Sequence, residues 1–340
     1  MDLVFSVVKA MSNSLAEICS GKLGKLEGNV SLSTSDVAQP VIMRDRRIPI
    51  ALRPKLKNEL ERLTEMKVIC PVDEPTPWVS QICVIRKKSG DLRISLDPRE
   101  LNKALMRENY TLPVLDDVLH EMSESRVFTK CDLSSGYWHC VLDENSSYLT
   151  TFQTVHGRFR WLRLPFGLSV SAEIFGKKLL EALDGLQNVV CIADDVVIHG
   201  KNVEEHDKYL GKFIERCKFK GIVLNPEKLE LRKNRISFMG HCITEKGLIA
   251  DPSKVEAVEK MPAPTNVKEL RRFLGVINYL SKFIPRMADT TQPLRNLMKN
   301  DVRFTWSEAQ DEAFKNVKMA ITNSPVLALY DPAKELTVRV

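Results

Sequence analysis

The chain has 340 residues, of which 44% are hydrophobic and 28% are charged, with 50 Lys and Arg against 44 Asp and Glu. This composition excludes an intrinsically disordered chain and a fibrous repeat, and the length suffices for a buried core divided into two or three subdomains. The net charge of +6 is a mild bias that is compatible with a phosphate-rich partner but does not require one.

The cysteines and the apolar stretches bear on where in the cell the protein is expected. The eight cysteines form no Cys-x-x-Cys pair, and the six histidines are not spaced to complete a zinc site, so we expect free thiols in a reducing environment. The N-terminus has no basic region before its short apolar run, and no stretch reaches the roughly 20 apolar residues of a membrane span. We therefore expect a soluble intracellular protein.

The N-terminal part is predicted to contain an arm and a helix. Residues 1–48 are mixed and rich in serine, with weak periodicity, which is typical of a linker or a loosely docked arm. From Pro54, Leu and Met recur at helical spacing among charged residues and predict an amphipathic helix that ends near Ile69.

Two runs rich in Val and Ile follow, and the sequence beyond them predicts a centre rich in strands. The runs flank Lys87-Lys88-Ser89-Gly90 and predict a strand pair joined by a basic turn, of the kind that commonly meets phosphates. The predicted strands cover residues 78–86, 91–96, 127–132, 137–142, 150–155 and 159–164, and the predicted helices cover 113–122 and 169–183.

Residues 189–198 form an apolar run that Asp194 and Asp195 interrupt in its middle, which predicts a second hairpin that carries two acids. After this hairpin we expect a helix over 202–220, a strand over 236–243 and a predominantly helical remainder.

Three aspartates are the candidate catalytic residues. Asp132 ends a strand that is predicted to be buried, and Asp194 and Asp195 stand at a hairpin tip, so adjacent strands could bring the three carboxylates together. Such clusters bind hard divalent cations, and two magnesium ions can activate an attacking hydroxyl and neutralise a leaving pyrophosphate. The alternative is ordinary turn and cap chemistry, which acids in such places commonly serve.

Five motifs in order favour the catalytic interpretation, because they resemble those of reverse transcriptases, most closely those of gypsy-type long-terminal-repeat retrotransposons. The resemblance runs from about residue 45 to the end of the chain. The matching segments are Ile85–Arg93 with Leu96–Lys103, Cys131–His139, Leu162–Leu168, Ile192–Asp195 and Phe238–His241.

The resemblance implies an α+β right-hand polymerase with fingers, a palm built from an antiparallel sheet backed by helices, and a helical thumb. After an arm at 1–48, fingers and palm would occupy 49–243, the thumb 244–303, and the lead-in to a truncated ribonuclease H-like region 304–340. The nuclease carboxylates would follow the end of the chain, and no protease-like Asp-Thr/Ser-Gly motif precedes the polymerase, so neither of these activities is expected.

By the same resemblance, Asp132, Asp194 and Asp195 hold two Mg²⁺ ions, for which Mn²⁺ is a possible substitute, and the backbone carbonyl of Leu133 is a further ligand. Tyr137 corresponds to the aromatic ring that lies beneath the incoming sugar and would clash with a 2′-hydroxyl, although a tyrosine here could also be a core residue.

Further residues match positions that contact nucleotide and primer. Lys87 and Arg93 correspond to basic residues that clamp the triphosphate, for which a solvated cationic loop is the alternative. Phe166 and Gly167 correspond to the lining of the nucleotide pocket. Met239 and Gly240 correspond to the backbone that grips the primer end; these last two pairs could otherwise be ordinary packing.

The predicted thumb carries a concentration of basic residues on an amphipathic helix, where they would meet a duplex backbone; a solvated helix face is the alternative. The three that we assign to duplex binding are Lys268, Arg271 and Arg272. One departure from the family pattern is Ile192, where most members have Tyr.

The expected function is template-directed DNA synthesis from an RNA or DNA template during retrotransposon replication. The expected partners are a template–primer duplex, deoxynucleoside triphosphates and other parts of a pol polyprotein, in the cytoplasm within a virus-like particle and with possible nuclear access. A second hypothesis is a decayed or domesticated fragment that binds nucleic acid without catalysis. A third, a generic metal-dependent phosphotransferase, explains neither the basic thumb nor the match at the primer grip.

Overall fold

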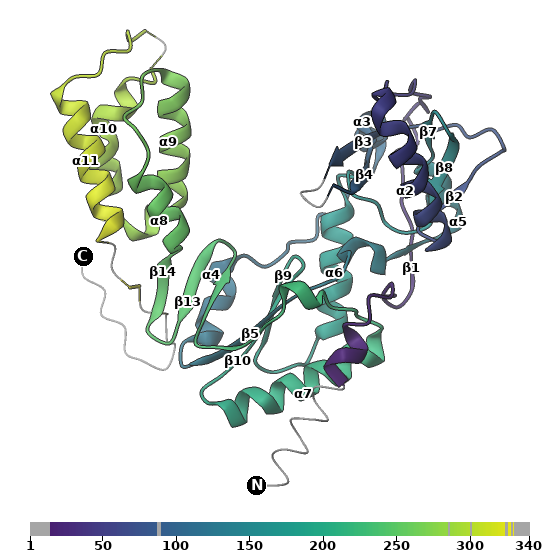
Figure 1. Ribbon diagram of the computed structural model, residues 1–340, viewed down its shortest axis with the longest axis horizontal. Helices are drawn as coiled ribbons and strands as arrows, with labels where there is room; N and C mark the ends of the chain where they lie inside the picture. The colour runs from purple at the N-terminus through teal and green to yellow at the C-terminus, as the bar shows by residue number, and fades with distance from the viewer. Residues whose placement is uncertain are drawn as a thin grey trace. The chain divides into compact units, whose positions relative to one another are not determined.

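The computed structural model describes residues 14–86, 90–284, 286–299, 301–323, 326, 327 and 329. The chain divides into two compact units that interleave along the sequence (Figure 1). The first unit comprises Met1–Val114, Lys130–Ile198 and Asp207–Glu230, and the second comprises Leu115–Thr129, His199–His206 and Leu231–Val340.

The first unit mixes helices with small sheets. Its helices are α2 (Arg53–Glu65), α3 (Arg99–Ala104), α5 (Glu144–Leu149), α6 (Ser171–Leu183) and most of α7 (Val203–Lys220). Its strands are β1 (Asn29–Val30), β2 (Ile69–Pro71), β3 (Gln81–Arg86), β4 (Leu92–Asp97), β6 (Val141–Leu142), β7 (Phe152–Thr154), β8 (Gly157–Trp161) and β9 (Val189–Ile192).

The hydrophobic pattern explains how these elements pack. The apolar stripe of α2 buries Leu56, Leu60 and Leu63, and Pro54 fits the first turn of the helix, where a missing backbone N–H costs nothing. The rings of Phe152 and Trp161 lie 5.9 Å apart in the core, where both side chains are fully buried. The predicted helix from Pro54 and the predicted strand pair of β3 and β4 are therefore present, with the helix ending at Glu65.

Two strands carry the chain between the units. These are β5 (Val127–Asp132) and β10 (Asp195–Gly200), which lie next to each other in a sheet of order β11-β5-β10-β9, with β11 at Glu230–Lys233. Their parts at 130–132 and 195–198 belong to the first unit. The sequence placed both strands correctly, and each is buried along most of its length.

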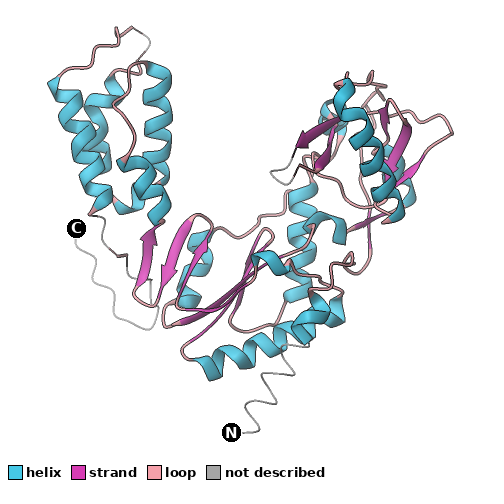
Figure 2. Ribbon diagram, viewed as in Figure 1, coloured by secondary structure: helices cyan, strands magenta, loops and turns pink. Residues whose placement is uncertain are grey.

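The second unit contains a three-stranded antiparallel sheet and a helical part (Figure 2). Its remaining elements are α4 (Leu115–Val118), β12 (Arg235–Phe238), β13 (His241–Thr244), β14 (Gly247–Ala250), α8 (Pro252–Glu259), α9 (Val267–Tyr279), α10 (Met287–Asn296) and α11 (Glu308–Thr322). Helix α11 packs on α9 through the rings of Phe314 and Phe273, whose centroids lie 4.7 Å apart. The helical part thus continues past residue 303, where the sequence placed the end of the thumb.

The expectation of a loosely docked N-terminal arm was wrong for the residues that the structure describes. Ile18 and Leu26 are buried, with 4% and 2% of their surface exposed. The backbone N–H of Leu26 donates to the carbonyl of His139 at 2.9 Å, and β1 pairs in parallel with β6. These contacts make the segment part of the core of the first unit.

Two predicted strands were also wrong. Residues 137–142 form a 3₁₀ turn, Gly136–His139, followed by the two-residue strand β6, because Ser135 adopts a left-handed conformation (φ 54°) that turns the chain. Residues 236–243 form two antiparallel strands, β12 and β13, because Met239 and Gly240 make a turn between them with φ of 46° and 73°. Among the helices of the described residues, none combines the length and the hydrophobicity that crossing a bilayer requires.

Candidate active site

Local geometry brings the three predicted aspartates to one cavity of the first unit. Asp132 is the last residue of β5, and Asp195 is the first residue of β10. Ile192 pairs with Asp195 across the β9–β10 hairpin, so Ala193 and Asp194 form a two-residue turn, and Ala193 takes the positive φ (55°) that such turns need. All three acids line a cavity of about 550 Å³.

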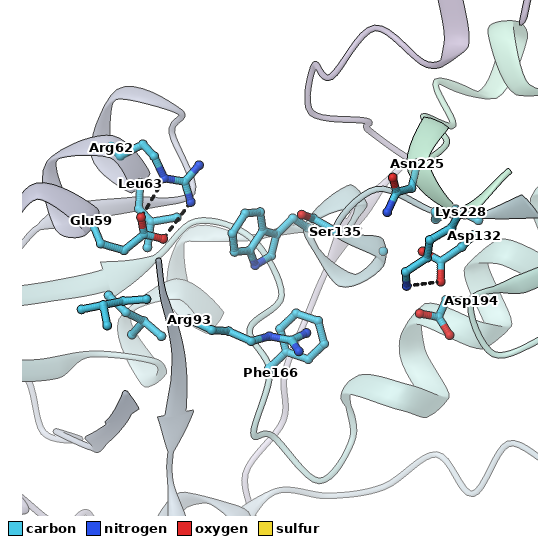
Figure 3. Close-up of a pocket in the computed structure, with 15 residues that line it drawn as sticks. Glu59, Arg62, Leu63, Arg93, Asp132, Ser135, Phe166, Asp194, Asn225 and Lys228 are labelled. Atoms are coloured by element: carbon cyan, nitrogen blue, oxygen red, sulfur yellow. Dashed lines mark hydrogen bonds and ion pairs between the residues drawn. The ribbon is translucent and has the colours of Figure 1, made fainter. Parts of the chain in front are cut away.

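Two lysines neutralise part of this acidic cluster. The Lys228 ammonium donates to Oδ2 of Asp132 at 2.7 Å, and Lys130 Nζ lies 3.2 Å from Oδ2 of Asp195. Figure 3 shows the Lys228 side chain reaching Asp132, with Asp194 close by. Lys228 is 60% exposed at its side chain, whereas Asp132 is 11% exposed, so the carboxylate is the fixed partner and the lysine is the one free to move.

Burial disfavours an ionised Asp195, and the neighbouring charges act in both directions. Burial raises the pKa of its carboxyl, with smaller contributions from the charges of Asp194 and Asp132, while the Lys130 ammonium opposes the rise. The hydrogen bond to Asp132 raises the pKa of Lys228, which keeps that lysine charged. Burial is therefore the main cause that disfavours the Asp195 carboxylate, and a cation in the cavity favours it.

The donor set suits a hard divalent cation, although the cations present are lysines. Carboxylate oxygens are the ligands that magnesium prefers, and three of them face one cavity. Within the described residues, no three His, Cys, Asp or Glu side chains already stand in the arrangement of a metal cluster. A cation bound here would compete with Lys228 and Lys130 for the carboxylates of Asp132 and Asp195.

A second cavity of about 330 Å³ adjoins the acids and has an aromatic and basic wall. Arg93 stacks its guanidinium 4.4 Å from the centre of the Phe166 ring, as Figure 3 shows, and Asp132, Leu133 and Asp194 also line this cavity. A stacked guanidinium presents its donors edge-on, which is the geometry that phosphate oxygens accept. Lys87, the other predicted triphosphate contact, lies outside the described residues.

Tyr137 forms the support of this wall. Its ring centre lies 4.5 Å from that of Phe166 and 5.4 Å from that of Phe175. Burial raises the pKa of the Tyr137 phenol, and the charge of Asp194 adds to the rise. Tyr137 is thus part of the aromatic packing, as the core interpretation expected, and the sugar contact stays a prediction.

Gly167 does not line the cavity, although its neighbour Phe166 does. Its φ is 110°, and a Cβ at this position would stand 1.9 Å from the carbonyl oxygen of Leu96. This close approach lets the backbone N–H of Leu96 donate to the carbonyl of Phe166 at 2.9 Å. Gly167 therefore fixes Phe166 against β4 and contributes to the site through backbone packing.

The predicted primer-grip residues lie in the second unit. Met239 and Gly240 form the turn between β12 and β13, and the Tyr279 hydroxyl donates to the Met239 carbonyl at 2.6 Å. On α9, the predicted duplex-binding residues Lys268, Arg271 and Arg272 are exposed, while Leu270, Phe273, Leu274 and Ile277 are buried. The helix thus presents its basic residues to solvent, as its amphipathic pattern predicted.

Sequence reasoning missed Lys130, Lys228 and Tyr279. Lys130 stands two residues before Asp132, and β-strand alternation places both side chains on one face, so this lysine carried a usable signal. Lys228 is 96 residues from Asp132, and Tyr279 is 40 residues from Met239. A local sequence pattern cannot predict contacts between residues so far apart in the chain.

Comparisons with known proteins agree with this geometry. Residues 85–277 match the family described as reverse transcriptase (RNA-dependent DNA polymerase). The Tf2-3 and Tf2-4 transposon polyproteins of Schizosaccharomyces pombe are 31% identical to 97% of the chain, which spans 25% of the length of each.

Two solved structures share the fold. One is the foamy viral protease–reverse transcriptase in complex with double-stranded DNA (TM-score 0.85, 20% identity, 96% of this chain and 70% of that one). The other is the same viral protein with an RNA/DNA hybrid (TM-score 0.83, 20% identity, 96% and 45%). The fold is the expected mixture of helices and antiparallel sheets.

Proposed function

The chain belongs to the reverse transcriptase family, and from this premise we propose that it extends a primer by template-directed DNA synthesis in retrotransposon replication. The observation that carries the proposal is the convergence of Asp132, Asp194 and Asp195 on one cavity, next to the Arg93 and Phe166 wall of another. This pairing matches an enzyme that must hold cations and a triphosphate side by side.

Asp132, Asp194 and Asp195 would hold two Mg²⁺ ions, with the Leu133 carbonyl as a further ligand and Mn²⁺ as a possible substitute. When bound, the ions supply a lowered pKa for the primer 3′-hydroxyl and charge neutralisation for the leaving pyrophosphate. The protein's own contribution is placement, since carboxylates fixed at strand ends keep the reacting groups in line.

The remaining residues orient the substrate. Arg93 would bind phosphate oxygens with its planar fork, because stacking on Phe166 already holds the guanidinium and little side-chain entropy is lost on binding. The Tyr137 ring would lie beneath the sugar, and the partners of the site would be deoxynucleoside triphosphates and a template–primer duplex. The foamy viral protease–reverse transcriptase, which shares the fold, has been solved in complex with double-stranded DNA and with an RNA/DNA hybrid, and these complexes support the duplex partner.

A non-catalytic fragment that only binds nucleic acid is the competing function. The observation in its favour is that lysines contact Asp132 and Asp195. Retention of all three aspartates favours the enzyme, because a protein that only binds duplexes does not need acids at a phosphate site.

Primer extension on an RNA template with magnesium and deoxynucleotides tests the proposal. The unsubstituted chain is compared with the double variant Asp194→Asn, Asp195→Asn and with a matched control, Asp36→Asn, Asp73→Asn, which neutralises two exposed acids elsewhere in the first unit. We expect the parent and control to extend the primer and the site variant to lose at least about 10³-fold in rate.

Extension by the site variant at the parent's rate would remove the proposed catalytic acids. Duplex binding without extension by the parent would establish the non-catalytic alternative.

A further inference from the structure

The turn at Met239 and Gly240 is held by one side chain from helix α9 and one from strand β13 of its own unit. The Tyr279 hydroxyl, at the end of α9, donates to the Met239 carbonyl at 2.6 Å, and Nδ1 of His241 lies 3.0 Å from the same oxygen. Met239 has a positive φ of 46°, a conformation that costs free energy for a residue with a side chain. Tyr279 and His241 therefore both contact the carbonyl of a strained turn that the pairing of Phe238 with His241 closes.

Gly240 shows how closely the two helices approach this turn. A Cβ on Gly240 would stand 1.9 Å from the Tyr279 hydroxyl oxygen and 2.5 Å from Nζ of Lys254 on α8. Only glycine leaves both side chains their places. The turn, Tyr279 and Lys254 thus form one interlocked cluster, which we call the turn cluster.

Lys254 contacts an aromatic ring and has no carboxylate partner among the described residues. Its ammonium lies 3.7 Å from the centre of the Tyr279 ring, and in the part of the chain that the structure describes it forms no ion pair. Its position in the first turn of α8 opposes the helix dipole, so helix stability does not explain the choice of a cation there. The nearby acid Asp116 is already paired with Lys282.

An uncompensated ammonium beside a strained backbone turn is suited to an anion. The Tyr279 side chain is partly exposed, at 41%, so a ligand can reach the cluster. A cation held on an aromatic face keeps its charge while losing mobility, which favours binding of a phosphate in a defined position.

We propose that Tyr279 positions the Met239–Gly240 turn and that Lys254, held on the Tyr279 ring, binds a backbone phosphate of the primer strand near its 3′ end. The inference deepens the proposed function and rests on it. Tyr279 is a positioning residue, since it acts through the turn, whereas Lys254 contacts the nucleic acid directly.

Two conservative variants separate these roles, and each has a matched control. Tyr279→Phe removes the hydroxyl and keeps the ring, and Tyr209→Phe makes the same change on α7, where Tyr209 is no part of the site. Lys254→Gln removes the ammonium, and Lys260→Gln does so at the other end of α8, where Lys260 pairs with Glu256. Each variant is assayed for kcat, nucleotide KM, duplex affinity at several salt concentrations and thermal unfolding.

We expect Tyr279→Phe to lower kcat by about three- to tenfold, the value of one hydrogen bond, with nucleotide KM, duplex affinity and unfolding temperature unchanged. We expect Lys254→Gln to weaken duplex binding and to lower the slope of log affinity against log salt by about 1, the signature of one lost phosphate contact. Both controls should match the parent.

Primers with one methylphosphonate, which is uncharged, locate the contact. At a single position near the 3′ end, this replacement should weaken the parent's binding as much as Lys254→Gln does and have no further effect on the variant. An unchanged kcat in Tyr279→Phe overturns the positioning role, and an unchanged salt slope in Lys254→Gln overturns the phosphate contact. If the parent binds duplex but never extends it, the proposed function fails instead, and the salt and methylphosphonate measurements still decide the contact of Lys254.

Discussion

The two units hold their candidate functional residues by different means. In the first unit, Asp132 and Asp195 are met by the flexible ammonium ends of Lys228 and Lys130. In the second, the Met239 carbonyl is met by a neutral tyrosine hydroxyl within a packed cluster. The ion pair of Lys228, whose side chain is 60% exposed, exchanges easily for another cation, whereas a neutral hydrogen bond offers no charge for a cation to replace. The acidic cavity can therefore change its cationic partner, and the hydrogen bond at Met239 does not depend on one.

The largest expected effect comes from replacing one glycine by alanine in each unit and comparing the losses in the free energy of unfolding. Gly167→Ala puts a Cβ 1.9 Å from the backbone oxygen of Leu96, which cannot move alone, so we expect a loss of about 4 kcal/mol in the free energy of unfolding. Gly240→Ala meets only side-chain ends, Tyr279 and Lys254, and should cost about 1 kcal/mol because these can swing away. Urea unfolding measures both; equal losses would contradict the distinction between backbone and side-chain contacts.

The two units should respond to acid in the same way, because each contains a buried histidine. Burial lowers the pKa of His139 in the first unit and of His199 in the second to about 4, against 6.5 for the free side chain. The unfolded chain therefore takes up protons first, and the stability that is complete above pH 6.5 is lost as the pH falls towards about 4. Each histidine should contribute about 3 kcal/mol to this loss.

Hydrogen exchange read by mass spectrometry as the pH is lowered reports each unit by its own peptides. His139→Gln should flatten the profile of the first unit only, and His199→Gln that of the second only. A profile that neither variant changes would place the acid sensitivity in other groups.

The smallest expected effect tests whether Mg²⁺ can replace Lys228 at the Asp132 carboxylate. Lys228→Met leaves Asp132 without its ammonium, so added Mg²⁺ should stabilise the variant more than the parent, by about 1 kcal/mol. Thermal unfolding with and without Mg²⁺ measures the difference, and Lys220→Met, which breaks an ion pair with Glu27 away from the acids, is the control. Equal stabilisation of all three proteins would mean that Lys228 and the metal do not compete.

The sequence allowed prediction of the elements that local patterns specify. The apolar run 127–132 gave β5 with correct bounds, and the pair Asp194-Asp195 placed a hairpin tip that the structure confirms. These succeed because alternation and turn chemistry act over a few residues. The strand predicted at 137–142 failed since its aromatic residues fit a strand as well as a turn, and only the left-handed Ser135 decides between them.

The sequence predicted which residues form the candidate site, but it did not predict the distant residues that contact them. Three aspartates, Arg93 and Phe166 line adjoining cavities as the motifs implied. The contacts of Lys228 and Tyr279, and the packing of Ile18 and Leu26, depend on segments far apart in the chain. Such contacts come from tertiary packing, which no window of the sequence contains.

The docking of the N-terminal segment has a consequence for how the protein is made. Lys25 donates from its backbone to Gly221, and Leu224 donates to Ile18, so the segment around 18–26 finds these partners only when the region around 221–224 has also emerged from the ribosome. Until then Ile18 and Leu26 remain exposed on a nascent chain, where chaperones and aggregation compete for them. The first unit must therefore complete its packing after residues 221–224 have been synthesised, and its folding rate should be set by this long loop rather than by its helices.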